Sequence, residues 1–417
     1  MKGAVIFLDP KGTILEIIRI AKQRGYQVIA LSSDASLLNA APDPYKSALS
    51  CIERVIHVKN WTNERAILNI CDSIHSEMPI VGVYAGMDSC AKILAQLRDK
   101  YGLPTSRAED LEIILNKYSL RKKLNALGLS KIKNYHSDEV SKWSAWVPKG
   151  AVYFKPVHGF FSAYVRRCEN MIELQDAIAT LKAGNKDEPE YITNYLRKTN
   201  DFLLEDAFDG ELLSVEAIAC NGNVQVLGLL SRILYSKDPV VEMGSCFPYP
   251  HSLSDKIISL VKNAHEALGL TDGPTHTEVI VNRNGEVEII DLNPRFVGAD
   301  VLQSINYAFG IKIQEALFDY TIGAEVKINK KEEHYSCIQY FLPPLIETLK
   351  NVLFPDVPEI KFSAAFMAPG AKVANTKRQI DYLGCYLTVM PTFQSAVDRS
   401  KELRSMVKIN DNYIGEY

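Results

Sequence analysis

The sequence predicts an α/β protein, and three observations support this fold class. Over the first hundred residues, short apolar segments alternate with segments of helical periodicity, which is typical of a doubly wound parallel sheet. From residue 152 onward, hairpin patterns replace this alternation. The chain has 417 residues, which is enough for two to four domains of about 100–200 residues each.

Residues 1–108 are expected to form the doubly wound domain. Its strands are predicted from short apolar runs, and its helices from apolar residues at every third or fourth position. The expected strands are Ala4–Leu8, Val28–Leu31, Val55–Val58 and Ile80–Tyr84. The expected helices are one that carries Ile14, Ile17, Ile18 and Ala21 and ends at Gly25, then Asn63–His75 and Ser89–Tyr101. The region lacks the glycine fingerprint of dinucleotide-binding domains, which argues against such a role.

The remaining chain is divided into residues 109–205, residues 206–324, and a separate α+β appendage over residues 325–417. Its first part is expected to be one helical region, residues 109–127, that ends at Gly128. The strands expected after it are Val152–Pro156, Ala163–Arg167, Phe202–Glu205, Leu213–Ala219 and Val224–Leu230. The other expected features are a helix near Met171–Leu181, an exposed polar loop Lys182–Glu190, a helix Ser254–Leu268 and a hairpin Glu278–Leu292.

The composition excludes several classes of protein. Lys and Arg number 47 against 50 Asp and Glu, so the net charge of −3 offers no basic footprint for nucleic acid. The longest basic cluster, Arg121-Lys122-Lys123, is interpreted as a solvated helix face. No apolar stretch reaches the ~18 residues of a membrane span, and the first apolar run is too short for a signal peptide. Because the 8 cysteines form no CxxC pair, we expect reduced thiols in a cytoplasmic protein, without a disulfide framework or zinc site.

The most informative segment is a predicted hairpin around Asn284-Gly285. An Asn-Gly pair between two apolar runs favours a two-residue type I′ turn, in which both residues have positive φ. Counting outward from this turn places Glu278 opposite Asp291, and His276 opposite Asn293. The two carboxylates are therefore expected to be cross-strand neighbours.

Alternation along the second strand places Val287, Ile289, Asp291 and Asn293 on one face, which begins apolar and becomes acidic. Two facing carboxylates repel each other unless a cation lies between them. Glu278, Asp291 and the amide of Asn293 offer hard oxygen ligands, which suit Mg²⁺ or Mn²⁺. The alternative is that Asp291 and Asn293 only terminate a strand, and that Glu278 faces solvent.

This hairpin resembles the metal-binding signature of the ATP-grasp superfamily, in which an acidic residue and an Asp/Glu-x-Asn-Pro/Ala-Arg strand hold Mg²⁺ against the phosphates of ATP. The matching residues here are Glu278 and Asp291-Leu-Asn293-Pro-Arg295. The resemblance implies an ATP-grasp architecture, with an N-terminal doubly wound α/β domain, a small α+β lid domain and an α+β C-terminal domain. It also implies ATP and two Mg²⁺ or Mn²⁺ ions.

Three further segments resemble the nucleotide site of the family, in the expected order. Lys117, which opens a helix, and Lys155, at the end of a strand, resemble the two phosphate-binding lysines, and lysine is a compact charge for phosphate. Glu205, Asp206 and Phe208 resemble the adenine hinge. The good matches cover about residues 110–300.

Two features depart from the family pattern. The phosphate loop is glycine-poor and reads Val157-His158-Gly159-Phe160-Phe161-Ser162, so we expect Ser162 to contact phosphate while the two phenylalanines form a hydrophobic lid. The position of the ribose-binding glutamate is taken by Leu212. Glu211 or Glu216 is expected to replace it, and the residues alone do not decide between them.

The resemblance also implies a chemistry, in which a carboxylate is activated as an acyl phosphate and then attacked by an amine, with release of ADP and phosphate. Such enzymes act by positioning and charge neutralisation. Lys155 and Arg295 are assigned the catalytic roles, and Arg295 would hold the carboxylate or acyl phosphate bidentately.

Among the subfamilies, the overall order is similar to bacterial L-amino-acid ligases, which form dipeptides. Glu242-Met-Gly244-Ser245 resembles their Glu-x-Gly-His substrate loop, so Glu242 would meet a substrate ammonium group. Ser245 stands in place of the histidine, and His276 is expected to supply the missing basic group.

Two other functions stay open. One is a biotin-carboxylase-like activation of bicarbonate, which uses the same nucleotide site. The other is a nucleotide-binding regulator with little turnover, which the glycine-poor loop favours. The expected partners are a small-molecule carboxylate and amine rather than nucleic acid or membrane, and homodimers are common among related ligases.

Overall fold

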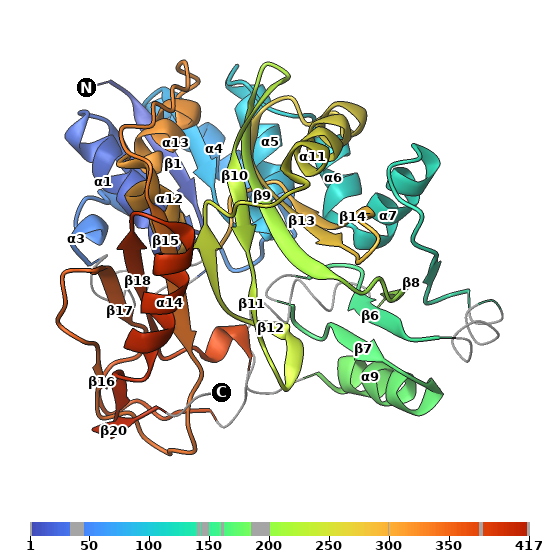
Figure 1. Ribbon diagram of the computed structural model, residues 1–417. Helices are drawn as coiled ribbons and strands as arrows, with labels where there is room; N and C mark the ends of the chain where they lie inside the picture. The colour runs from blue at the N-terminus through green and yellow to red at the C-terminus, as the bar shows by residue number, and fades with distance from the viewer. Residues whose placement is uncertain are drawn as a thin grey trace.

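The computed structural model describes residues 2–33, 46–139, 142, 150–159, 162–184, 201–298, 300–374 and 378–414. Figure 1 shows the N-terminal region in blue and the C-terminal region in red on one side of the molecule, and a small green unit with α9 on the other. Within these ranges, no helix is long and apolar enough to cross a bilayer.

The N-terminal sheet is parallel, as the alternating pattern predicts, and has the strand order β3-β2-β1-β4. Side chains on the two faces of β1 enter different cores: Val5 and Phe7 pack towards α1 and α13, whereas Ile6 and Leu8 pack towards α4 and α5. The strands are β1 (Ala4–Leu8), β2 (Gln27–Ser32), β3 (Arg54–His57) and β4 (Ile80–Ala85). The helices are η1 (Gly12–Ile14), α1 (Leu15–Gln23), α3 (Lys46–Leu49), α4 (Glu64–Glu77), η2 (Asp88–Cys90) and α5 (Ala91–Lys100).

The helical region after this domain is divided into α6 (Ala108–Leu115) and α7 (Lys117–Ala126). Asn116 separates them because its side chain accepts a hydrogen bond from the N–H of Ser119 (2.9 Å), which caps α7. The single helical region predicted here is therefore two helices, and Lys117 is the first residue of the second.

The green unit in Figure 1 is an antiparallel sheet of order β5-β8-β6-β7, covered by α9. The strand predicted from Ala163 begins later, at Arg166, because Ser162 and Tyr164 have φ of +51° and +59°. The elements are β5 (Asn134–His136), β6 (Val152–Pro156), β7 (Arg166–Cys168), α9 (Met171–Ala183) and β8 (Phe202–Asp206). Of the predicted loop Lys182–Glu190, residues 185–190 lie outside the described residues, and 182–183 belong to α9.

A second antiparallel sheet has the order β10-β9-β13-β14. Its apolar face packs against α6, α7 and α11, around residues such as Val215, Val279 and Ile289. The elements are β9 (Glu211–Cys220), β10 (Asn223–Ser231), α11 (Ser254–Leu268), β13 (Gly273–Val281) and β14 (Val287–Asn293).

The turn of the β13–β14 hairpin differs from the predicted two-residue loop. The N–H of Asn282 donates to the carbonyl of Glu286 (2.9 Å), so residues 283–285 form a three-residue loop. Within this loop only Gly285 has a positive φ, +72°, which suits a loop that ends in a left-handed residue. The predicted turn is wrong by one residue, because a type I′ turn would also require positive φ at Asn284.

A bulge at Ile290 restores the predicted pairing beyond the turn. Val279 faces Ile289 and Glu278 faces Asp291, so Ile290 has no partner on β13. The extra residue reverses the alternation of the strand, so that Ile289 lies in the core beneath α11 whereas Asp291 lines a cavity. The predicted cross-strand pair is confirmed, but the prediction that Ile289 and Asp291 share one face is wrong.

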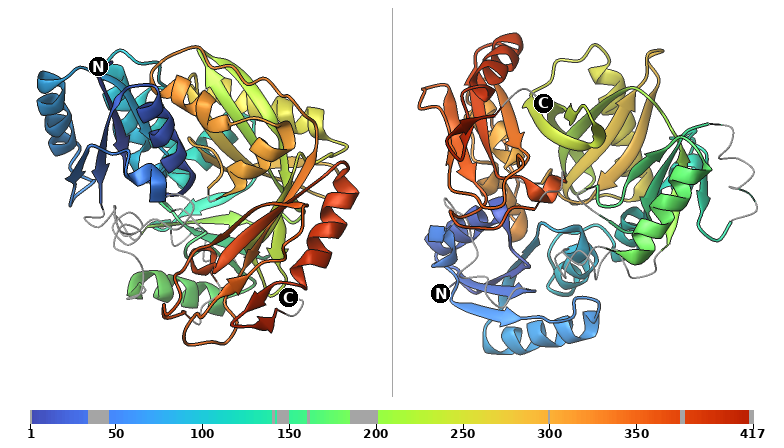
Figure 2. Two further views of the ribbon diagram at one scale, coloured as in Figure 1. Left: turned by 90° about the vertical axis from the view of Figure 1, so that its left-hand side faces the viewer. Right: turned by 90° about the horizontal axis from the view of Figure 1, so that it is seen from below.

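The segment from residue 325 is α+β but is not separate. Its strands join β11 and β12 in one sheet of order β11-β12-β15-β18-β17, in which Gly244 of β12 pairs with Gln339 of β15. In Figure 2 the red and orange elements lie against the yellow-green strands in both views. The elements are β11 (Ile233–Tyr235), β12 (Asp238–Phe247), α12 (Val301–Phe309), α13 (Ile313–Thr321), β15 (Tyr335–Phe341), β16 (Val352–Leu353), β17 (Ile360–Ala365), η4 (Gln379–Asp381), β18 (Gly384–Met390), α14 (Phe393–Arg404), β19 (Lys408–Ile409) and β20 (Asn412–Tyr413).

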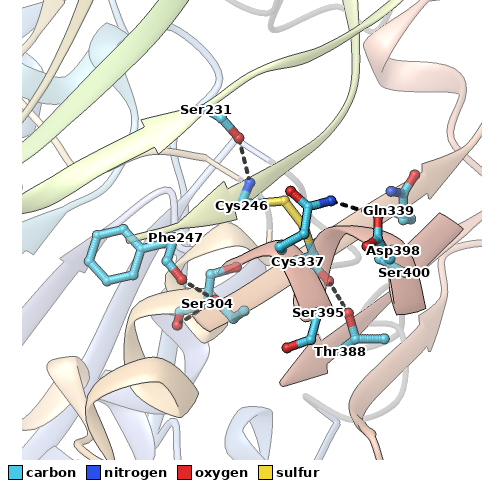
Figure 3. Close-up of a disulfide and its surroundings, with 12 residues drawn as sticks. Ser231, Cys246, Phe247, Ser304, Cys337, Gln339, Thr388, Ser395, Asp398 and Ser400 are labelled. Carbon is cyan, nitrogen blue, oxygen red and sulfur yellow. Dashed lines mark hydrogen bonds between the residues drawn. A yellow bond between two sulfur atoms is a disulfide. The ribbon is translucent and has the colours of Figure 1, made fainter. Parts of the chain in front are cut away.

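A disulfide joins Cys246 and Cys337, which face each other across β12 and β15 with Cα atoms 4.1 Å apart (Figure 3). The expectation that all cysteines are reduced is therefore wrong for this pair, because the strands bring together two cysteines that lie 91 residues apart in sequence. The other six cysteines are free. The disulfide fastens the C-terminal strands to β12, the strand that carries Glu242.

Gly244 tests the close contact between β12 and β15. An added Cβ there would lie 2.2 Å from the carbonyl oxygen of Ile338, whereas at Gly150 it would meet no atom within 4 Å. We expect Gly244→Ala to lower the free energy of unfolding by about 1–3 kcal/mol or more through overpacking, and Gly150→Ala to change it little. Chemical denaturation of both variants measures this, and equal stabilities would contradict the described strand contact.

Candidate active site

The predicted site residues converge on one cavity of about 580 Å³. Residues from three sheets line it: the small sheet β5-β8-β6-β7, the sheet β10-β9-β13-β14, and the C-terminal sheet β11-β12-β15-β18-β17. Most of the predicted site residues line the cavity, although their assigned roles stay predictions. The lining residues among them are Lys117, Lys155, Ser162, Glu205, Asp206, Phe208, Glu242, His276, Glu278, Asp291, Asn293 and Arg295.

A buried carboxylate between two cations lies where the small sheet meets the β13–β14 hairpin. Glu205 on β8 forms ion pairs with Lys155 on β6 (2.6 Å) and with Arg121 on α7 (2.6 Å). Burial alone would raise the pKa of Glu205, but the charges of Arg121 and Lys155 outweigh it and lower the pKa to about 2. The carboxylate is thus ionised and holds the Lys155 ammonium at the cavity wall.

Of the cluster predicted to form a solvated face, Lys122 and Lys123 are exposed, whereas the prediction is wrong for Arg121. Its side chain is 2% exposed, and it also donates to the carbonyls of Ile289 (2.7 Å) and Ile290 (3.5 Å). The bulge at Ile290 interrupts the strand ladder, and these two carbonyls lie at that interruption. Lys155 lies 3.4 Å from the carbonyl of Ile290, so both cations are anchored to the bulge.

The two facing carboxylates are each neutralised by a protein cation. Asp291 forms an ion pair with Lys117, and Glu278 lies 3.6 Å from a guanidinium nitrogen of Arg232 and 3.3 Å from Nε2 of His276. Burial would raise the pKa of Glu278, but the hydrogen bond from His276 and the nearby positive charges lower it well below its usual range. The anticipated repulsion is therefore relieved within the protein itself.

The acidic end of the cavity fits a hard divalent cation only as a partial site. Among the residues that the structure describes, no group of three or more His, Cys, Asp or Glu side chains could hold a metal. Two cross-strand carboxylates and the amide of Asn293 nevertheless lie on one cavity-lining face, and such oxygens suit Mg²⁺ when phosphates and water complete the shell. The donor set thus fits a cation that arrives together with phosphates.

His276 is held between carboxylates. Its Nδ1 contacts Glu216, which is fully buried and also accepts from the N–H of Val297 (2.9 Å). Burial would lower the pKa of His276, but Glu216 outweighs it and raises the pKa to about 9. A protonated His276 donates to Glu216 and Glu278, so it acts as a cation at the cavity wall.

Three proposed contacts do not reach the cavity. Glu211 is exposed and accepts from the hydroxyl of Tyr249 (2.6 Å), because it lies on the opposite face of β9 from Leu212, which lines the cavity. Glu216, the other candidate for the ribose, is covered by His276. Ser245 is fully buried and does not line the cavity. The ribose and substrate assignments of these residues are therefore corrected.

Arg295 reaches across a domain boundary. It donates to Asp88 in η2 of the N-terminal domain (2.8 Å), and a carboxylate oxygen of buried Asp88 has no partner among the described atoms. The N-terminal sheet thus contributes to the site, because η2 follows the carboxyl end of β4. In the predicted phosphate loop, residues 157–162, Gly159 and Ser162 line the cavity. Phe160 and Phe161, which were expected to form a hydrophobic lid, lie outside the described residues.

Sequence reasoning missed Arg232, which directly follows β10. Its side chain is 2% exposed, and it forms an ion pair with Glu242 and lies 3.0 Å from His276. No motif marked this isolated arginine, and the only available signal was a charged residue immediately after an apolar strand. Tyr340 and Tyr382, which also line the cavity, carried no sequence signal either.

Comparison with known proteins identifies the central part of the chain. A family model described as an ATP-grasp domain matches residues 149–303, the segment that carries Lys155, Glu205 and the β13–β14 hairpin. The chain contains an ATP-grasp domain. The L-amino acid ligase from Bacillus licheniformis has the same fold, with a TM-score of 0.78 over 99% of both chains and 20% sequence identity. The ATP-grasp architecture expected from the sequence is therefore confirmed.

Sequence relatives of this ATP-grasp protein are distant. The uncharacterized protein y4rH of Sinorhizobium fredii is 24% identical over 85% of this chain and 74% of that protein. The alanine–anticapsin ligase of Bacillus amyloliquefaciens is 24% identical over 57% of this chain and 53% of that ligase. The match therefore spans about half the length of the ligase.

The pKa of Glu205 predicts how acid affects stability. Because the folded pKa of about 2 lies below the ordinary value of 4.5, this carboxylate stabilises the fold above pH 4.5, and the contribution is lost as the pH falls towards 2. We expect Glu205→Gln to be less stable than wild type at pH 7, since Arg121 and Lys155 lose their partner. The difference in free energy of unfolding between wild type and Glu205→Gln should be smaller by about 1 kcal/mol at pH 3.5 than at pH 7. Urea unfolding at both pH values measures it, and a constant difference would refute the assigned pKa.

Proposed function

We propose that this ATP-grasp protein is a carboxylate–amine ligase that consumes ATP and acts on an amino acid. The observation that carries the proposal is the cavity itself, which brings the cations Lys117 and Lys155 together with a carboxylate pair and with the ion pair of Arg232 and Glu242. The likeness to an alanine–anticapsin ligase and to an L-amino acid ligase supports the same reaction class.

The nucleotide would occupy the side of the cavity formed by the small sheet. Lys155 and Lys117 lie at the wall with ammonium groups suited to the phosphates, and Phe208 and the chain at Asp206 provide the adenine side. Both lysines now pair with carboxylates, so phosphate oxygens would compete with Glu205 and Asp291 for them. Glu278, Asp291 and Asn293 would hold Mg²⁺, which neutralises phosphate charge when it is bound.

The reaction balances without a protein nucleophile. A carboxylate oxygen of the acid attacks the γ-phosphorus, ADP leaves, and the acyl phosphate forms. The amine nitrogen then attacks the carbonyl carbon, phosphate leaves with the C–O bond electrons, and the nitrogen gives one proton to water as the amide forms. Arg295, with its guanidinium on the cavity wall, would hold the acid or its phosphate. Protonated His276 and Arg232 supply further positive charge where negative charge develops.

The products of ATP test this reaction. We expect release of ADP and phosphate that requires Mg²⁺ or Mn²⁺ and a carboxylate, when the protein is screened over pairs of amino acids with mass spectrometry of the product. AMP and pyrophosphate would rule out the acyl phosphate route. Turnover with bicarbonate alone would favour the carboxylase-like reading, and nucleotide binding without turnover would favour a regulator.

Metal binding by the hairpin can be tested without turnover. Mg²⁺–ATP should raise the melting temperature of wild type through binding, and should raise that of Asp291→Asn much less. Without ligand, Asp291→Asn should melt lower than wild type, because Lys117 loses its partner. Glu286→Gln is the matched control, since it makes the same carboxylate-to-amide change at an exposed residue beside the loop of the same hairpin. Equal ligand-induced shifts in all three proteins would show that Asp291 holds no metal.

A further inference from the structure

One wall of the cavity comes from outside the matched domain. Tyr340 on β15, together with Gln379 and Tyr382 at η4, lines the cavity although all three follow residue 303. We call these three residues the C-terminal wall. The rings of Tyr340 and Tyr382 stack with centroids 4.7 Å apart and planes 18° apart, so they present one continuous aromatic surface.

The C-terminal wall is bonded to the strand that carries Glu242. The hydroxyl of Tyr382 donates to the backbone carbonyl of Glu242, and the amide of Gln379 donates to the carbonyl of Val240 (3.4 Å). Leu234 on β11 pairs with Glu242 and also lines the cavity. These contacts gather apolar and aromatic side chains around one acidic group.

The acidic group at this end of the cavity has a basic partner, and the side chains around it are neutral. Glu242 is paired with Arg232, and its carboxylate is largely buried, with 18% of the side chain exposed. The hydroxyl of Tyr340 is buried and has no hydrogen-bond partner among the described residues. Among the described residues of the C-terminal wall and its neighbours Leu234 and Val240, none carries a charge.

We propose that the C-terminal wall selects the acid that is phosphorylated, and that this acid is an α-amino acid with a neutral, large aliphatic or aromatic side chain. The proposal rests on the ligase function argued above. The carboxylate of the acid lies towards Arg295 and the metal-binding carboxylates, its ammonium meets Glu242, and its side chain packs on Tyr340, Tyr382, Leu234 and Val240.

Charge explains the selection. A substrate acid with a charged side chain would have to bury that charge against this wall with no opposite charge beside it, and burial of an unpaired charge is costly. A large apolar side chain instead removes its own surface and that of the two rings from water. A small side chain such as that of alanine would leave much of the aromatic surface uncovered.

Hydroxylamine trapping measures the acid specificity alone. The nitrogen of hydroxylamine attacks the acyl phosphate, phosphate leaves, and a hydroxamate forms, so no amine substrate has to be known. With ATP and Mg²⁺, we expect leucine, methionine and phenylalanine to exceed alanine, aspartate, glutamate, lysine and arginine by about tenfold or more in kcat/KM. Hydroxamate formed equally from all acids, or best from charged ones, would overturn the proposal but leave the ligase function intact. No hydroxamate and no ADP from any acid would overturn both.

Charge variants of Val240, the cavity-lining neighbour of the C-terminal wall, test whether the side chain of the acid binds at this wall. Val240→Lys should shift the preference towards aspartate and glutamate, and Val240→Glu should shift it towards lysine and arginine, each with loss of phenylalanine. Leu345→Lys is the control, because Leu345 belongs to the C-terminal region that carries the wall but is 90% exposed and outside the cavity. Thermal melting verifies that each variant is folded. An unchanged acid profile in folded Val240 variants would show that the side chain binds elsewhere and would overturn the proposal.

Discussion

The bulge at Ile290 is the constraint on which the rest of the site depends. One extra residue in β14 changes the face of the sheet on which the following side chains lie. Ile289, before the bulge, lies in the core, whereas Asp291, after it, faces the cavity. The same interruption places two carbonyls where Arg121 and Lys155 can bind them. Without the bulge, Asp291 and Asn293 would point into the apolar core beneath α11, and Leu292 would face the cavity. A local irregularity therefore aligns the acidic pair and anchors the cations that face it.

The charged side chains that line the cavity neutralise one another. Glu205 is paired with Lys155 and Arg121, Asp291 with Lys117, and Glu242 with Arg232. Such pairing makes buried charge tolerable, because an isolated ion in this setting would be strongly destabilised. A phosphate that binds in the cavity would therefore replace the carboxylate partner of a lysine. A metal cation would replace the basic partner of a carboxylate. The cavity is therefore prepared for charged ligands without carrying a large uncompensated charge.

The C-terminal strands form part of the cavity and are not a separate appendage. β15 and β18 extend the sheet of β12, a disulfide joins β12 to β15, and Gly244 lets the two backbones approach closely. The N-terminal domain contributes in the same way, since Asp88 binds Arg295 from the end of its parallel sheet. The matched ATP-grasp domain thus supplies Lys155, Glu205 and the β13–β14 hairpin to the cavity, whereas segments outside it contribute Lys117 and the C-terminal strands.

By itself, the sequence determined the features that depend on local chemistry. Apolar periodicity indicated the parallel sheet, and the residues around Asp291 marked the acidic hairpin. Only the tertiary structure decided which of these groups meet. Arg121 and Arg232 are unremarkable in sequence but become buried partners of Glu205 and Glu242, and Cys246 meets Cys337 across 91 residues. The physical reason is that ion pairs, strand register and bulges depend on distances between segments that local sequence patterns do not encode.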